Sequence, residues 1–346
     1  MFVNAHTHLY SGLAPLGMPA PEVEPRSFPE ILQRVWWRLD RALDERSLRA
    51  AARFYLAEAR LAGTAALIDH HESPKFICGS LDLLADACQE LGMPAVLCYG
   101  ITERNRGRLE AQCGLDECRR FLLHNRRPLV RGMVGLHASF TVSDDTIERA
   151  GDLCREFGTA LHVHVAEDTC DVDDARSRGF AGPLERLRDL DALVPGSILA
   201  HGVHLSPDQV RMAEDQGCWF VQNPRSNLGN RVGYASSLAE CGRVALGTDG
   251  YPSDMSVELS ALLEDGRRHG EAEVDLRTRL ARGRELVVER FGGVLPPEAA
   301  SAPGQPGECD GAEPHRTALP STDLLETIRA EARLEAERLW ARMRGL

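Results

Sequence analysis

Short apolar runs alternate along the chain with longer segments in which apolar residues recur at helical spacing. The runs predict eight strands, near residues 2–9, 64–70, 94–100, 130–137, 160–166, 196–203, 218–222 and 243–248. Within residues 27–62, for example, Ile31, Val35 and Leu39 follow the spacing of an amphipathic helix. This alternation predicts an α/β fold, either a doubly wound sheet or a (β/α)8 TIM barrel. The strand count favours the barrel, and no Gly-x-Gly-x-x-Gly follows the first strand, which argues against dinucleotide binding.

The end of the chain has a different character. Residues 296–320 are rich in Pro, Gly, Ala and Glu, which is typical of a flexible linker. Residues 321–346 return to a helical pattern. We therefore predict a barrel over residues 1–295, a linker over residues 296–320 and a C-terminal helix over residues 321–346.

Composition narrows the class of protein. The 346 residues are 43% hydrophobic and carry a net charge of −12, which disfavours a nucleic acid or an anionic membrane as partner. Apolar runs are far shorter than the roughly 20 residues that span a bilayer, and we expect no signal peptide at the N-terminus. The ten cysteines include no Cys-x-x-Cys pair, so reduced thiols are expected. We therefore predict a cytoplasmic protein that acts on a small molecule.

Histidines and an aspartate lie where predicted strands end. His6 and His8 are two apart on the first strand, so both side chains point the same way. His164 lies nearer the end of the fifth strand than His162, which we interpret as a buried histidine lower in the barrel. Asp249 follows the eighth strand, where a buried acid is costly without a cation. Active sites of barrels form at this end of the strands, so these residues are candidate ligands of a divalent metal.

Two further residues suit proton transfer beside such a metal. Glu167 lies three residues beyond His164, and a carboxylate that is not a ligand can move protons to and from an activated water. His201 ends the sixth strand. Each residue alone has an ordinary structural explanation, but their repeated position at strand ends favours one shared site.

Four motifs in this order resemble the amidohydrolase superfamily, in its branch of chlorohydrolases and aminoheterocycle deaminases. They read Asn-Ala-His-Thr-His, His-Val-Ala-Glu, Ala-His-Gly-Val-His and Gly-Thr-Asp-Gly. The segments Asp-His-His at 69–71 and Gly-Leu-His-Ala-Ser-Phe-Thr at 135–141 are most similar to the SsnA-like aminohydrolases. The resemblance covers about residues 1–260.

The resemblance implies a role for each candidate. One metal, usually zinc with iron or manganese as alternatives, would be held by four side chains: His6, His8, His164 and Asp249. Glu167 would shuttle protons, His201 would orient the water or polarise the substrate, and Asp249 would also accept a proton. The expected substrate contacts are His137, His70 and Asn223.

Lysine usage bears on the number of metals. Relatives with two metals often bridge them through a carboxylated lysine on the fourth strand. The only lysine here, Lys75, follows the second strand, so we expect a single ion. Relatives also carry a longer segment before the first motif, which forms part of a small β domain. Only five residues precede His6, so we expect that domain to be absent or much reduced, and the barrel surface could then serve a homodimer.

The reaction expected from this site is hydrolysis of a carbon–nitrogen bond other than a peptide bond. Hydrolytic deamination of an amino-heterocycle, an imine or a guanidine-like molecule is the first hypothesis. Ring-opening hydrolysis of a cyclic amide or imide uses the same site and is the second. A non-catalytic metal-binding scaffold is the third. Gln222 stands where relatives often have histidine, which leaves the substrate open.

Overall fold

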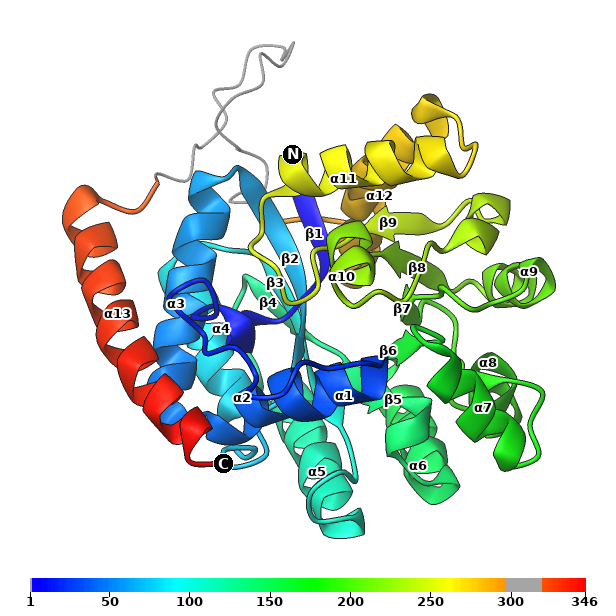
Figure 1. Cartoon of the computed structure of the whole chain (residues 1–346), viewed down its shortest axis with the longest axis horizontal. Coiled ribbons are helices and arrows are strands. Elements are labelled where there is room, and N and C mark those ends of the chain that lie inside the picture. Colours follow the sequence, from blue (N-terminus) through cyan, green and yellow to red (C-terminus); the bar gives the residue numbers. More distant parts are fainter. Residues whose placement is uncertain (1, 297–318) are drawn as a thin grey trace.

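A computed structural model of the chain, which describes residues 2–296 and 319–346, contains one parallel sheet (Figure 1). Each predicted strand is confirmed, and the fourth is divided in two. The strands are β1 (Phe2–Thr7), β2 (Thr64–His71), β3 (Ala95–Ile101), β4 (Val130–Gly132), β5 (Val134–Ala138), β6 (Leu161–Val165), β7 (Ile198–His201), β8 (Trp219–Gln222) and β9 (Val244–Leu246).

The strands form a nearly closed (β/α)8 barrel. Neighbours in the sheet follow chain order, β1-β2-β3-β5-β6-β7-β8-β9, and β4 also pairs with β3. Thr7 pairs with Asp249, and the backbone N–H groups of Thr248 and Asp249 each donate to the carbonyl oxygen of His6 at 3.0 Å. A doubly wound sheet would reverse its strand order at one point. The predicted barrel is therefore confirmed over the doubly wound alternative.

Helices surround the barrel (Figure 1). They are α1 (Phe28–Ile31), α2 (Trp37–Ala42), α3 (Glu45–Leu61), α4 (Ser80–Glu90), α5 (Arg108–His124), α6 (Asp144–Phe157), α7 (Thr169–Ser177), α8 (Pro183–Asp189), α9 (Pro207–Asp215), α10 (Pro224–Gly229), α11 (Met255–Arg268), α12 (Glu273–Arg290) and α13 (Thr322–Arg344). No helix in the described parts of the chain is long and apolar enough to cross a membrane.

The helical pattern over residues 27–62 is interrupted twice. A π-helical segment, Leu32–Trp36, joins α1 to α2. The chain then leaves the helix at Leu43, and Asp44 caps α3 by accepting a hydrogen bond from the backbone N–H of Ser47. The apolar periodicity continues through these breaks, so it could not reveal them.

Alternation along each strand separates an outer face from the barrel interior. Leu67, Leu97 and Phe220 pack in the large core cluster that holds the buried faces of the helices. Their neighbours Ile68 and Val96 belong to a second cluster, made largely of residues from successive strands. The inward-facing positions on β6 are therefore those of His162 and His164.

The C-terminal helix α13 lies beside α3, on the outside of the barrel (Figure 1). Its Trp340 is buried and donates from Nε1 to the carbonyl oxygen of Leu16 at 3.0 Å. Arg38 donates in turn to the carbonyl oxygen of Met343 at 2.8 Å. The expected C-terminal helix is thus present, whereas the expected linker, residues 296–320, lies outside the described residues except at its two ends.

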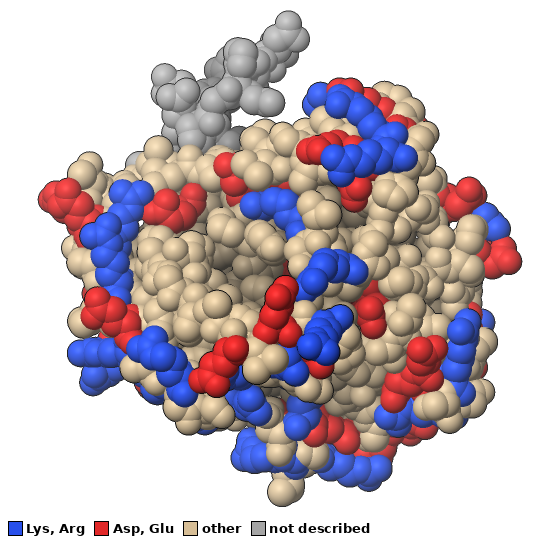
Figure 2. Space-filling view, viewed as in Figure 1, with Lys and Arg blue, Asp and Glu red and all other residues tan. Residues whose placement is uncertain are grey.

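Charges of both signs are interspersed on the face shown in Figure 2. Many charged side chains of the protein are paired, for example Arg211 with Glu240 at 3.0 Å and Arg329 with Glu58 at 2.8 Å. Exposed pairs of this kind contribute little to stability, about 0–1 kcal/mol each. On that face the net negative charge is therefore spread over the surface and does not form one acidic patch.

Candidate active site

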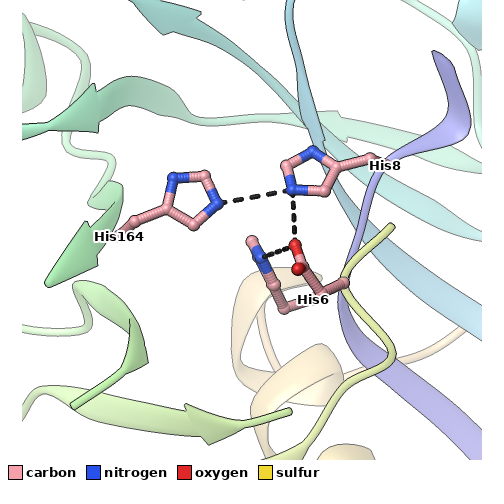
Figure 3. Close-up of side chains that lie close together, drawn as sticks. His6, His8 and His164 are labelled. Atoms are coloured by element: carbon pink, nitrogen blue, oxygen red, sulfur yellow. Dashed lines mark hydrogen bonds and ion pairs between the residues drawn. The ribbon is translucent and has the colours of Figure 1, made fainter. Parts of the chain in front are cut away.

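Four side chains predicted as metal ligands meet at the carboxyl end of the strands (Figure 3). His6 comes from β1, His8 follows it, His164 comes from β6, and Asp249 lies in the turn after β9. Their nearest nitrogen and oxygen atoms all lie within 4.8 Å of one another, and all four residues are buried. The shortest separations join His8 Nε2 to Asp249 Oδ1 at 2.7 Å and His8 Nε2 to His164 Nε2 at 3.3 Å.

The hydrogen bonds made by Nδ1 of His8 and Nδ1 of His164 indicate that a cation lies between the two Nε2 atoms. His8 donates from Nδ1 to the carbonyl oxygen of His70 at 2.5 Å, and His164 donates from Nδ1 to that of His137 at 2.6 Å. In each neutral ring the lone pair is therefore on Nε2. Two lone pairs 3.3 Å apart beside the carboxylate of Asp249 repel unless a metal ion or a proton lies between them.

The electrostatics agree with this arrangement. Burial lowers the pKa of His6 to about 3 and that of His164 well below its ordinary value, so both rings are neutral ligands. Burial is the largest single influence on His8 and works against its charge, but the hydrogen bond to Asp249 and the negative charges of Asp249, Glu72 and Asp69 together raise the pKa of His8 to about 9. Without a metal, a proton is therefore the cation that His8 shares with Asp249, and a metal must displace it.

A further histidine supports the ligand set from inside the barrel. His162 is fully buried, as expected from its inward position on β6. Its Nε2 lies 2.9 Å from His6 Nδ1, which donates the hydrogen bond when His6 turns its other nitrogen to a metal. His162 Nδ1 in turn lies 3.6 Å from Cys98 Sγ. The position expected for His162 is confirmed, and its contact with His6 fixes the orientation of a ligand.

Glu167 and His201 lie beside the ligands. Asn230 donates to Glu167 Oε1 at 3.0 Å, while Oε2 lies 3.6 Å from His201 Nε2. Burial raises the pKa of Glu167 to about 7, against the opposing effect of His201. His201 donates from Nδ1 to Asn227 Oδ1 at 2.8 Å, and its Nε2 is buried without a partner. A carboxyl that titrates near neutrality and an unpartnered imidazole nitrogen are thus available beside the metal ligands.

The backbone is strained where several of these side chains begin. Ala166, His201 and Asp249 have φ values of +47°, +75° and +53°, in the left-handed region that non-glycine residues avoid. They follow or end β6, β7 and β9. Such strain costs about 1–3 kcal/mol at each position and concentrates at functional sites. The surrounding barrel must therefore supply the stability that holds these turns.

A pocket opens over the ligands. It is lined by His8, Tyr10, Phe28, Leu32, Trp36, Trp37, Asp40, Glu72, His137, Ala138, Phe140, His164, Glu167, Asp168, Asp171, Asn230, Asp249 and Gly250. The predicted substrate contact His137 is among them. The other two predicted contacts are not, and these two predictions need correction.

His70 and Asn223 are fully buried below the pocket. His70 faces Glu72 Oε1 from Nδ1 at 2.8 Å and the carbonyl oxygen of Leu136 from Nε2 at 3.0 Å. Asn223 donates to the carbonyl oxygen of Val221 at 3.4 Å. His70 is the penultimate residue of β2 and Asn223 directly follows β8, but neighbouring residues cover both side chains completely.

Sequence reasoning missed part of the pocket wall. Glu72 is buried and directly follows β2, so the same strand-end rule that selected Asp249 could have found it. Asp40 pairs with Arg104 across 64 positions of sequence, with Oδ2 and Nη2 2.8 Å apart. No local pattern signals that pair. Trp36 and Trp37 also line the pocket, although core packing is the more common role for such residues.

Comparison with known proteins shows the family to which the chain belongs. The model of the amidohydrolase family matches residues 2–283. A 5-methylthioadenosine/S-adenosylhomocysteine deaminase of Archaeoglobus fulgidus is 30% identical over 270 residues, 76% of this chain and 61% of the relative. A deaminase of the same name from Thermoanaerobacter pseudethanolicus is 27% identical over 262 residues, 74% of this chain and 58% of the relative. The chain thus spans about three fifths of the length of these curated relatives.

Solved structures share the fold at lower identity. A zinc-bound adenosine deaminase from Xanthomonas campestris has a TM-score of 0.66 and 21% identity, covering 82% of this chain and 67% of its own. Guanine deaminase from E. coli has a TM-score of 0.68 and 18% identity, covering 82% and 69%. An atrazine chlorohydrolase from Arthrobacter aurescens complexed with zinc has a TM-score of 0.68 and 20% identity, covering 84% and 70%.

Proposed function

The chain belongs to the amidohydrolase family, and from that premise we propose that it is a single-metal hydrolase that deaminates a small amino-substituted heterocycle. One observation carries the proposal: the facing Nε2 atoms of His8 and His164 converge on Asp249, directly beside Glu167. The deaminase names of the curated relatives support the reaction class. The zinc in two of the similar structures supports the choice of metal.

The residues present fit one divalent ion. His6, His8 and His164 offer imidazole nitrogens and Asp249 a carboxylate oxygen, a donor set that suits zinc and also accepts iron or manganese. Two other groups of three candidate ligand atoms each share a member with this set: His8, His70 and Glu72, and Glu167, His201 and Asp249. When bound, such an ion supplies Lewis acidity that lowers the pKa of a water molecule and makes it a nucleophile near pH 7.

Glu167 moves the protons of the proposed reaction. Its ionised carboxylate accepts a proton from the attacking water as a carbon–oxygen bond forms at the ring carbon. The same carboxyl then gives that proton to the amino nitrogen as the carbon–nitrogen bond breaks and ammonia leaves. The hydrogen bond from Asn230 holds Oε1 in place for both transfers. Asp249 is a second acceptor for a proton of the water, as the resemblance implied.

His201 orients the water. Because its Nδ1 donates to Asn227, Nε2 is the ring nitrogen left to form a hydrogen bond with the attacking water. We therefore propose orientation of the water, one of the two roles that the resemblance left open. His137 remains our proposed substrate contact, whereas His70 is better assigned to positioning His8 through its carbonyl oxygen.

Metal analysis and an ammonia assay test this proposal. The purified full chain should hold about one zinc ion, and a panel of aminopurines, aminopyrimidines and aminotriazines should include at least one compound that releases ammonia. The variant Glu167→Gln should retain the metal and lose the activity. Turnover without ammonia, with opening of a cyclic amide or imide, would establish the alternative hydrolase instead, and metal binding without turnover of any compound would leave a scaffold. The cytoplasmic location and a homodimer stay predictions.

A further inference from the structure

The pocket lining has an unusual chemical composition. Of its eighteen residues, six are carboxylates and five are Phe, Trp or Tyr, although those aromatic types make up 5% of the chain. No lysine or arginine lines it among the residues that the structure describes. A pocket that joins aromatic faces to carboxylates resembles the sites that bind organic cations.

Four of the six carboxylates are already engaged. Asp249 and Glu167 belong to the metal side of the pocket. Asp171 accepts hydrogen bonds from the backbone N–H groups of Phe140 and Ala166 and from a serine hydroxyl, and Asp168 caps the N-terminus of α7. Asp40 and Glu72 each pair through one oxygen, Asp40 Oδ2 with Arg104 at 2.8 Å and Glu72 Oε1 with His70 at 2.8 Å. Asp40 Oδ1 and Glu72 Oε2 are therefore the carboxylate oxygens left to meet the substrate.

Asp40 has an oxygen that nothing in the described chain satisfies. The residue is 2% exposed and lines the pocket. Its Oδ2 accepts from Arg104, but its Oδ1 is buried without a hydrogen-bond partner. Leaving such an acceptor unpaired destabilises the protein, so the site is suited to a ligand that donates a hydrogen bond to it.

Glu72 also lines the pocket and is also 2% exposed. Its Oε2 is 3.7 Å from Nδ1 of His8, one of the proposed metal ligands. Arg104 stays behind Asp40, with its guanidinium 4.8 Å from the ring of Trp37. This guanidinium thus contacts a carboxylate and an aromatic ring, and Arg104 is not among the residues that line the pocket.

We propose that the substrate presents a cationic, hydrogen-bond-donating group to Asp40 and Glu72. The proposal is based on these two residues of the pocket lining, and it rests on the proposed deamination. An ammonium, amidinium or guanidinium would donate to Asp40 Oδ1 and lie against the aromatic side chains. An anionic substituent there would meet two buried carboxylates, and no lysine or arginine lines the pocket among the described residues. The pocket therefore selects cationic amino-heterocycles over neutral ones and excludes anionic ones.

Three planar probes of nearly equal shape test the charge preference: benzamidinium, benzamide and benzoate. Their binding to the full chain is measured by calorimetry, both zinc-loaded and zinc-free, because benzoate can also bind zinc directly. We expect benzamidinium to bind at least about tenfold more tightly than benzamide, and benzoate to bind the zinc-free chain weakest. Equal affinities, or tighter binding of benzoate to the zinc-free chain, would overturn the proposal.

Variants locate the effect. Asp40→Asn and Glu72→Gln keep the shape of each side chain, and each should reduce the preference for benzamidinium over benzamide at least about threefold. Asp86→Asn is the matched control, because that carboxylate is 58% exposed and pairs with Arg127 on the surface. Melting temperature and zinc content confirm that each variant is folded. An unchanged preference in both pocket variants would overturn the proposal.

This test separates two failures. Binding of the probes requires no turnover, so charge selection without ammonia release from any compound would contradict the deamination and leave the cation site standing. Ammonia release from neutral and anionic heterocycles as fast as from cationic ones would contradict the cation site and leave the deamination standing.

Discussion

Replacing Glu167 by glutamine removes the proposed proton shuttle and little else. Glutamine has the same shape, and its amide oxygen can still accept the hydrogen bond that Asn230 donates at 3.0 Å. The metal ligands His6, His8, His164 and Asp249 are unchanged. General acid–base catalysis contributes about 10²–10⁴-fold to a rate, which corresponds to about 3–5 kcal/mol in the barrier. We expect kcat to fall by that factor while zinc content and melting temperature stay the same.

The pH profile gives a second measure of the same group. A base must be ionised to accept a proton, and burial raises the pKa of Glu167 to about 7. The ionised fraction then rises from about one tenth at pH 6 to about nine tenths at pH 8, so kcat/KM should increase about tenfold across that range. A bound divalent cation favours the ionised form and moves this limb to lower pH without changing its direction.

Ammonia release, followed at fixed zinc from pH 5 to pH 9, measures both quantities. The wild-type chain should show a rising limb at or below pH 7, and the Glu167→Gln variant should lack that limb. If the variant keeps more than about one tenth of the wild-type kcat, or the same acidic limb, another group transfers the proton. Asp145→Asn, in the first turn of α6 with a side chain that is 47% exposed, is a control that should change neither value.

Three other changes test the supports of the site. Asp249→Asn should weaken zinc binding by more than about 100-fold in a competition titration, since it removes the charged ligand, and full retention of affinity would exclude it from the ligand set. His162→Phe should weaken zinc binding about 10–100-fold by releasing His6 Nδ1, measured the same way, whereas an unchanged affinity would show that His6 needs no support. Trp340→Ala should lower the melting temperature on the order of 10 °C, because it opens a cavity under α13. Leu334→Ala, on the exposed side of that helix, should have little effect. Equal shifts in melting temperature for the two variants would mean that the buried face of α13 does not stabilise its packing.

The catalytic constellation could be predicted because each member is marked by its local sequence. A parallel barrel gathers the carboxyl ends of its strands at one face, so a histidine or an acid at such an end is placed before any contact is known. His6, His8, His164 and Asp249 each follow that rule, and the structure brings their ligand atoms together. Glu167 and His201 follow it too, so both lie beside the ligands.

The position of a residue near the end of a strand did not reveal whether its side chain reaches the pocket or is buried in the barrel. His70 and Asn223 lie near strand ends as well, yet both are fully buried. Glu72 lies two residues beyond His70, and it reaches the pocket. Both Glu72 and His70 depend on the neighbouring strand, since Gly100 on β3 leaves the space that the two side chains occupy.

The amino-acid sequence by itself predicted the barrel and the candidate metal ligands, because strand periodicity and strand-end motifs are local properties of the chain. Only the tertiary structure decided the far wall of the pocket. Asp40 and Arg104 meet across 64 positions, and α13 reaches back over more than 300 positions to hold the segment that carries Trp37 and Asp40. Such pairs depend on how the closed barrel brings distant segments together, and no periodicity within either segment encodes that meeting.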